Sequence, residues 1–227
     1  MKKSSYRFNQ SAVKINGVVC VLATLLIFFF VDKYIADFVK SIDWLVKNRQ
    51  SFGFHLLDEL GRAKNWVTGS GITIIGSSFF LYLKKGNRRR QKLVQYSGRI
   101  FLSVFATSMI VNAIKTFAGR YRPYNVNPDS SISFYSFQLL EGSYNKLGSF
   151  PSSHAAIAMA VVFSVYYINP KSKYLPYGFF LAGVVMVQRI ITLNHYLSDI
   201  VFGAGIGILM AYTACWFWKN FIKIGER

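Results

Sequence analysis

Six stretches of the chain are apolar and contain no charged residue, and polar segments separate them. They are Ile15–Val31, Trp66–Leu83, Ile100–Ile114, Ala155–Ile168, Leu175–Gln188 and Ile200–Trp218. Uncharged runs of this kind are typical of helices that cross a lipid bilayer. The third, fourth and fifth runs are short for a hydrocarbon layer of about 30 Å, so we expect flanking residues to complete them. The pattern predicts an all-α, polytopic membrane helical bundle of about six transmembrane helices, in a single domain over residues 1–227.

The segment after the first run has a different pattern. Apolar residues recur there at the spacing of one helix face, with charged residues between them, at Ile35, Phe38, Val39, Ile42, Leu45 and Val46. This pattern predicts an amphipathic helix that lies in the outer interface of the membrane. Two roles stay open for it: packing over the end of the bundle, or guiding a lipid head group inward.

Small residues inside the second and sixth runs predict close contacts between helices. Gly203 and Gly207, for example, stand at i and i+4 in the sixth run. Residues without a bulky side chain let helix backbones approach one another, so these positions suggest packing and no chemistry.

The charge distribution predicts the orientation of the chain. There are 27 Lys and Arg against 9 Asp and Glu, a net charge of +18. The segment from Lys84 to Arg99, between the second and third runs, is basic and contains no acid. Basic loops stay in the cytoplasm, so we expect both termini there and the first, third and fifth loops outside. Topology and attraction to anionic lipids account for the basic excess, so no nucleic-acid partner is expected.

A polar loop meets an apolar run at Phe150-Pro-Ser-Ser-His154. Pro151 suits the first position of a helix, and Ser152 and Ser153 can cap it. The start of such a helix has unpaired backbone N–H groups and the positive end of the helix dipole, so it attracts anions. His154 lies in this first turn, close to any anion that binds there.

The end of the third run brings two cations together. Lys115 and Arg122 are two helical turns apart, so a continuous helix projects them from nearly one face. Pro123 disfavours a helical conformation at Arg122 and ends the helix there. Arg120, between the two, is interpreted as a side chain that snorkels to lipid phosphates.

A third segment, after the fifth run, supplies acid–base groups. Arg189 begins it, and His195 and Asp199 follow at i and i+4, as neighbours on one helix face. Asp199 can accept a hydrogen bond from one ring nitrogen of His195 and leave the other nitrogen free to attack. Ionisable groups beside a membrane span are expensive to bury, which favours a functional role.

The three segments together have the composition of a phosphoryl-transfer site. A transferring phosphoryl group carries negative charge on three equatorial oxygens, which Lys115, Arg122, Arg189 and a helix N-terminus can neutralise. Of the two histidines, one can attack in line while the other protonates the leaving oxygen and then activates water. The sequence has no carboxylate cluster typical of a metal site. It therefore predicts metal-independent transfer through a phosphohistidine, without a cofactor.

These motifs resemble the three-part signature of the type 2 phosphatidic acid phosphatase and vanadium haloperoxidase superfamily. The matching residues are Lys115-x6-Arg122-Pro123, then Pro151-Ser152-Ser153-His154, then Arg189-x5-His195-x3-Asp199. The resemblance implies His195 as nucleophile, Asp199 as its orienting partner and His154 as acid–base. It implies a phosphate site made by Lys115, Arg122, Ser152, Ser153 and Arg189. The family usually has glycine at position 153 and serine at position 188, where this chain has Ser153 and Gln188.

The membrane branch of this superfamily implies an integral-membrane lipid phosphatase. The implied substrates are undecaprenyl diphosphate, phosphatidylglycerol phosphate, phosphatidic acid or lipid A phosphates, in a bacterial inner membrane with the site facing the periplasm or exterior. A lipid-to-lipid phosphotransferase is the close alternative. An anion transporter is disfavoured, because the cations lie at span ends rather than at the membrane midplane. The sequence does not define the oligomeric state.

Overall fold

The computed structural model describes residues 10–49, 51–83, 88–126, 137–139 and 147–222. The helices are α1 (Gln10–Phe30), α2 (Asp32–Lys40), α3 (Asp43–Asn48), α4 (Phe52–Leu60), α5 (Ala63–Leu83), α6 (Arg88–Phe117), α7 (Ser153–Ile168), α8 (Leu175–Ile191) and α9 (Leu197–Phe221). A 3-10 turn, η1, covers Pro123–Asn125, and two strands, β1 (Ala118–Arg120) and β2 (Phe137–Leu139), pair antiparallel. The all-α prediction holds for the bundle, but it missed this short strand pair.

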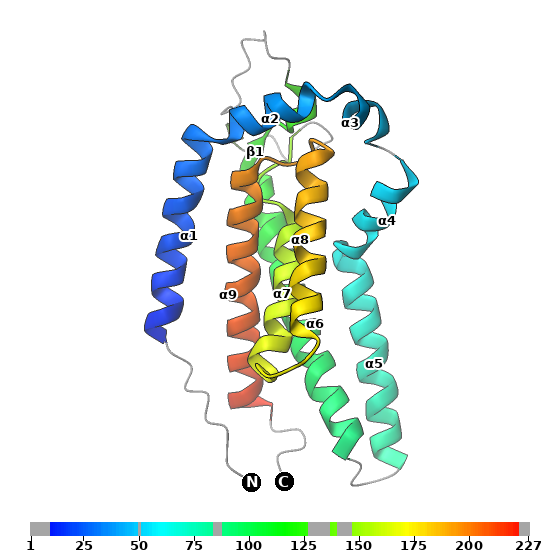
Figure 1. Cartoon of the computed structure of the whole chain (residues 1–227). Coiled ribbons are helices and arrows are strands. Elements are labelled where there is room, and N and C mark those ends of the chain that lie inside the picture. The colour runs from blue at the N-terminus through cyan, green and yellow to red at the C-terminus, as the bar shows by residue number, and fades with distance from the viewer. Residues whose placement is uncertain (1–9, 50, 84–87, 127–136, 140–146, 223–227) are drawn as a thin grey trace.

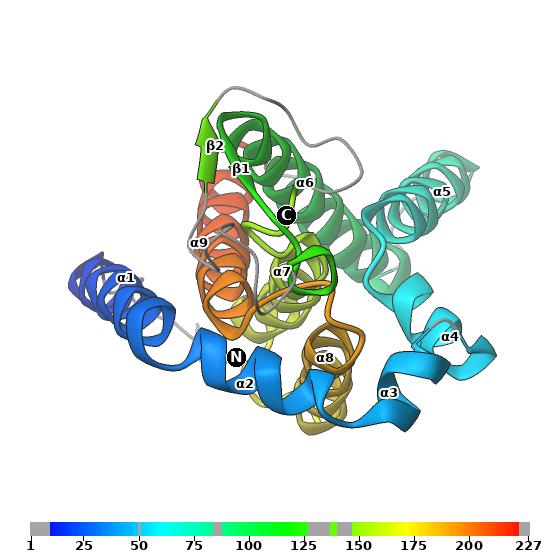
Figure 2. The same ribbon diagram turned by 90° about the horizontal axis from the view of Figure 1, so that it is seen from above.

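The six long helices run along one common direction (Figure 1). Seen from above, α6, α7 and α9 lie together in the middle, with α1 and α5 on opposite sides (Figure 2). A helix occurs at each of the six predicted places. Within the described residues, however, only Gln91–Phe117 and Leu197–Phe221 are long and apolar enough to cross a membrane on their own. The bent pair formed by α1 and α2 would make a third span, and α7 and α8 are shorter, so the count of six is not confirmed.

The contact between α7 and α9 is the most extensive in the bundle, and it depends on two glycines. A Cβ on Gly203 would lie 2.4 Å from the Ser152 carbonyl oxygen, and one on Gly207 would lie 2.1 Å from that of Ala156. Both distances are far below van der Waals contact. The predicted role of these glycines in close packing is therefore confirmed, and their spacing brings the start of α7 against the start of α9.

Helices α2 and α3 replace the single amphipathic helix that the sequence predicts. They cross one end of the bundle, over the tops of α9 and α8 (Figures 1 and 2). Ala36 is buried with Val126 and Tyr196, and the Lys40 ammonium donates to the Val126 carbonyl over 2.5 Å. This segment therefore packs over the bundle. Its guidance of a lipid head group stays a prediction.

The directions of the helices bring the three motifs together at the end of the bundle that α2 and α3 cross. We call this the covered end. Helices α6 and α8 finish there, while α7 and α9 begin there (Figure 1). Residues that are far apart in the sequence therefore become neighbours.

Gly207 provides a test of the α7–α9 contact. Replacing Gly207 by alanine would force the two helices apart, and we expect it to destabilise the protein by about 1–3 kcal/mol, as overpacking does. Gly183 in α8 is the matched control, because a Cβ there meets no atom within 4 Å. Gly183→Ala should leave the thermal midpoint of the detergent-solubilised protein unchanged or raise it, since alanine favours helix. Equal midpoints for the two variants would contradict the packing role.

Candidate active site

Arg120 is fully buried at the centre of the covered end. Its Nη1 donates to Asp199 Oδ1 over 2.5 Å, and its Nη2 donates to Asp32 Oδ2 over 2.9 Å. The guanidinium also stacks on the Tyr196 ring, 3.9 Å from its centroid. Burial alone would lower the pKa of Arg120, but the two carboxylates raise it above its ordinary value. The snorkelling interpretation was therefore wrong, because two acids from α2 and α9 hold the side chain inward.

Asp199 reaches His195 through Ser149 rather than directly. Asp199 Oδ2 accepts hydrogen bonds from the Ser149 hydroxyl over 2.5 Å and from the Tyr196 N–H over 2.9 Å. It lies 3.9 Å from His195 Nδ1, too far for a hydrogen bond. The Nδ1 atom lies instead 2.6 Å from the Ser149 carbonyl oxygen. This corrects the direct Asp199–His195 hydrogen bond expected from the i, i+4 spacing.

The Ser149 carbonyl determines the chemistry that His195 can perform. A carbonyl oxygen only accepts, so Nδ1 carries the proton and Nε2 keeps its lone pair when the ring is neutral. Burial lowers the pKa of His195 well below its ordinary value, and the charges of Lys115, Arg189 and Arg122 lower it further. The ring is therefore neutral near pH 7 and offers a nucleophilic Nε2. Sequence reasoning missed Ser149, although it directly precedes the Phe150–His154 motif.

Contacts place the three predicted cations close to His195, because Lys115 and Arg122 bind residues next to Ser149 and His195, and the Arg189 carbonyl accepts from the His195 N–H over 3.3 Å. Neutral oxygens hold two of them: the Lys115 ammonium donates to the Gly148 carbonyl over 2.6 Å, and Arg122 Nη1 donates to Asn194 Oδ1 over 3.1 Å. The third, Arg189, donates through Nη1 to Asp58 Oδ1. Asn194 and Asp58 were both missed by the sequence analysis.

Two guanidinium nitrogens in this cluster have no hydrogen-bond partner among the described residues. In the part of the chain that the structure describes, the Nε atoms of Arg122 and Arg189 are buried without a hydrogen-bond acceptor. Buried donors are almost always satisfied, because an unpaired one costs about 1–3 kcal/mol. The unpaired edges of two guanidinium groups are suited to a bound oxyanion, which accepts several hydrogen bonds at once.

His154 lies at the edge of the same cluster and contacts α4. Its Nε2 lies 3.1 Å from Asp58 Oδ1, an ionic contact outside hydrogen-bond geometry. The glycine at position 61 permits this approach, since a Cβ there would lie 2.3 Å from the His154 ring. Burial opposes ionisation of Asp58, but His154 and Arg189 outweigh it and hold the pKa of the carboxyl below its ordinary value.

The two serines of the second motif are placed by the start of α7. Ser152 is the N-cap, and its hydroxyl accepts from the Ala155 N–H over 3.5 Å, so the helix begins at Ser153. Pro151 therefore precedes the helix instead of opening it. The Ser152 N–H donates to the Asp199 carbonyl over 3.0 Å. A phosphate contact from Ser152 or Ser153 stays a prediction.

Gln188 replaces a usual family serine and connects α8 to α4. Its side-chain amide donates to the Phe54 carbonyl over 3.2 Å. The side chain thus supports the position of α4, and with it Asp58.

In the described part of the chain, no three His, Cys, Asp or Glu side chains gather in a way that could hold a metal ion. Independence from metals stays a prediction.

Residues 97–223 match the family model of the PAP2 superfamily. The match spans more than half of the chain, so the chain belongs to this superfamily, and the resemblance seen in the three motifs is confirmed. With its long apolar helices, the chain is an integral membrane protein. The bacterial inner membrane and the orientation of the site stay predictions.

The chain is also similar to individual proteins. It is 32% identical over 84 residues to the lipid A 1-phosphatase of Porphyromonas gingivalis, a match covering 36% of this chain and only 19% of that protein. A phosphatidylglycerolphosphate phosphatase from Bacillus subtilis has the same fold, with a TM-score of 0.55, 18% identity and coverage of 92% and 98% of the two chains. LpxE of Aquifex aeolicus gives a TM-score of 0.44 with 20% identity, over 75% and 90% of the chains.

Arg120 and Arg122 allow a test of which cations support the fold. Arg120→Ala leaves Asp32 and Asp199 buried without their partner, so we expect a loss of stability of about 3–5 kcal/mol. Arg122→Ala removes a cation whose side chain, among the described residues, donates to the neutral Asn194 amide, and it should change stability little. Thermal unfolding of both variants in detergent measures the difference. A stable Arg120→Ala protein would contradict the structural role of this arginine.

Proposed function

We propose that this protein is an integral-membrane lipid phosphatase that hydrolyses a phosphomonoester or diphosphate of a membrane lipid through a phosphohistidine. The observation that supports it best is the neutral His195 ring, whose Nδ1 faces the Ser149 carbonyl and whose Nε2 is free, with three cations close by. Of these cations Lys115 and Arg189 are buried, and Arg122 is half-buried. A cationic cluster around a neutral nucleophile suits phosphoryl transfer, where catalysis is mainly positioning and charge neutralisation.

The first step forms a bond between His195 Nε2 and phosphorus. Lys115, Arg122 and Arg189 bind the phosphoryl oxygens, and the N-terminus of α7 adds backbone N–H groups. As the bond from phosphorus to the lipid oxygen breaks, His154 donates a proton to that oxygen. The Ser149 carbonyl stabilises the positive charge that develops on the His195 ring.

The second step regenerates the enzyme. His154, now neutral, accepts a proton from a water molecule, and the water oxygen attacks phosphorus on the side opposite to His195. The phosphorus–nitrogen bond breaks, inorganic phosphate leaves, and both histidines return to their initial states. The protein cations supply the positive charge that a metal ion would otherwise provide.

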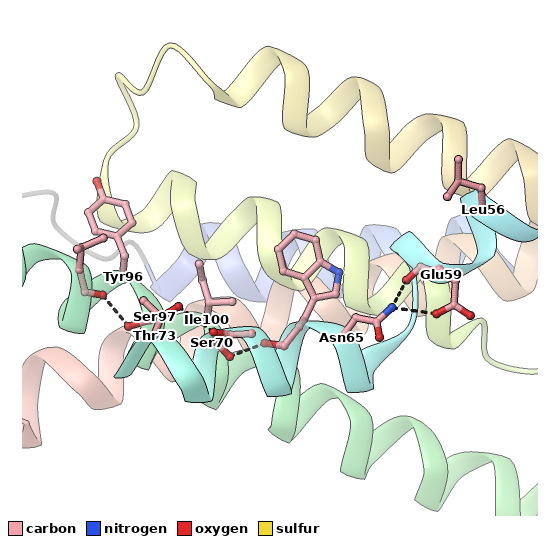
Figure 3. A pocket seen from close by; sticks show the side chains of 11 residues that line it. Leu56, Glu59, Asn65, Ser70, Thr73, Tyr96, Ser97 and Ile100 are labelled. Carbon is pink, nitrogen blue, oxygen red and sulfur yellow. Dashed lines mark hydrogen bonds between the residues drawn. The ribbon is translucent and has the colours of Figure 1, made fainter. Parts of the chain in front are cut away.

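An apolar groove next to the site supports a lipid as substrate. It has a volume of about 600 Å³ and lies between α5 and α6, lined at one end by Leu56 and Asn65 and at the other by Thr73 and Tyr96 (Figure 3). Leu56, at one end of the groove, belongs to α4, which is the helix that carries Asp58. A hydrocarbon chain in this groove would bring its head group toward the end of α4 that carries Asp58. The proposed substrates are phosphatidylglycerol phosphate, lipid A phosphate, phosphatidic acid or undecaprenyl diphosphate.

Mutation of the nucleophile tests the chemistry. In detergent with a chelator present, the wild type should release phosphate from at least one of these four lipids. His195→Ala should reduce the rate by roughly three orders of magnitude or more, as loss of a catalytic nucleophile does. His55, exposed on α4, is the matched control.

His55→Ala should keep the wild-type rate. Activity retained in His195→Ala, or an absolute need for a divalent cation, would contradict the proposal. Transfer of labelled phosphate to a second lipid instead of water would identify a phosphotransferase.

Filling the groove tests the lipid site. Gly69 lines the groove, and its position has open space for a Cβ. Gly69→Leu should lower kcat/KM about 10-fold for a long-chain lipid phosphate, by competing with one hydrocarbon segment, and leave a short-chain analogue unaffected. Gly76→Leu, on the same helix outside the groove lining, is the control. Equal losses on both chain lengths would contradict a role of the groove in chain binding.

A further inference from the structure

Asp58 is an acid within the candidate site that belongs to none of the three motifs. It lies on α4, two residues before the end of that helix, and its side chain is 19% exposed. Its Oδ1 contacts both His154 and Arg189. Of the acids that the structure describes, it is the one within ion-pair distance of His154.

We propose that Asp58 is a positioning residue that orients His154 and stabilises its protonated form during departure of the lipid oxygen. This inference rests on the proposed function, in which His154 is the acid–base group. Asp58 itself exchanges no proton and forms no bond to phosphorus.

The charges that face His154 explain why such a residue is needed. Burial, Arg189 from α8 and Lys115 from α6 together lower the pKa of His154 below its ordinary value, even with Asp58 present. Asp58 from α4 is the charge that favours the protonated ring. Without Asp58, burial and these cations would lower the pKa of His154 further, so a smaller fraction of the ring would carry the proton that the leaving oxygen requires.

Arg62 orients the Asp58 carboxylate for this role. Arg62 binds Oδ2 through Nε over 3.1 Å and through Nη2 over 2.9 Å, one turn further along the chain. This pairing fixes the carboxylate plane and leaves Oδ1 toward His154 and Arg189. The same oxygen thus positions the proton donor and one phosphate-binding arginine.

A different role would follow from the same contact with Arg189. The carboxylate could compete with the substrate phosphate for this arginine, in which case its removal would lower KM and leave kcat unchanged. The positioning role instead predicts a lower kcat with little change in KM, so the two are separable by kinetics.

The test is the pH dependence of phosphate release by Asp58→Asn in detergent, with the long-chain lipid phosphate that the wild type hydrolyses. We expect kcat to fall about 10- to 100-fold, part of the usual contribution of acid–base catalysis, with KM within about 2-fold. The alkaline limb of the profile should move at least about one pH unit lower, because an opposite charge at this distance shifts a titration by that much. Asp58→Glu should restore part of the rate.

Two comparisons separate positioning from general damage. A nitrophenyl phosphate ester has a leaving group that needs no proton, so Asp58→Asn should cleave it at close to the wild-type rate. In a His154→Ala background, Asp58→Asn should cause little further loss with the lipid. Asp37→Asn is the matched control, since Asp37 forms a similar i, i+4 pair with Lys33 over 2.6 Å, far from these histidines in the chain.

Each alternative result has a distinct meaning. An unchanged pH profile, a lower KM at constant kcat, or an equal loss on the nitrophenyl ester would overturn the positioning role. If Asp58→Asn does not fold, the Asp58→Glu variant decides by the same profile: an unshifted alkaline limb with full kcat overturns the role. A wild-type protein that releases no phosphate from any lipid refutes the proposed function itself, before any variant is compared.

Discussion

The ion-pair cluster of Arg120 with Asp32 and Asp199 holds the covered end of the bundle together. Taking these charges out of water is expensive, and only close pairing with complete hydrogen bonding offsets that penalty. Asp32 also accepts from the Ser198 N–H over 2.9 Å. The cluster thereby joins α2, β1 and the start of α9. Through Ser149 it extends to Nδ1 of His195, so the same interaction that closes the fold also sets the orientation of the ring.

The predictable part of the site came from residues whose position follows from local helix geometry. His154 lies in the first turn of α7, as the sequence indicates. Lys115 lies near the end of α6 as expected, but the helix ends at Phe117 and a strand follows, so the predicted helix end at Arg122 was wrong. Their convergence was predicted from the motif set, and the match of residues 97–223 to the PAP2 superfamily confirms the family. Helix ends can be predicted from a sequence because capping residues, prolines and changes from apolar to polar residues mark them.

The rest could not be predicted because it depends on contacts between distant segments. Arg120 looked like a lipid-facing cation, since its acidic partners lie 79 and 88 residues away. Among the described residues, the local partner of the Asp58 side chain is Arg62, and the contacts of Asp58 with His154 and Arg189 form only when α4 meets α7 and α8. The i, i+4 spacing of His195 and Asp199 suggested a direct bond, but His195 precedes α9, so the helical relation does not apply.

The way each cation is paired separates those that support the fold from those available to an anion. Arg120 is balanced by two buried carboxylates and keeps little charge for a ligand. Lys115 and Arg122 are held by a backbone carbonyl and an amide oxygen, which fix their positions without cancelling their charge. Arg189 is intermediate, because Asp58 accepts from one of its nitrogens while no described residue accepts from its Nε. Neutral acceptors thus preserve the attractive field of these cations for an anion, whereas Asp58, at the edge, opposes part of the effect by which burial and the cations lower the pKa of His154.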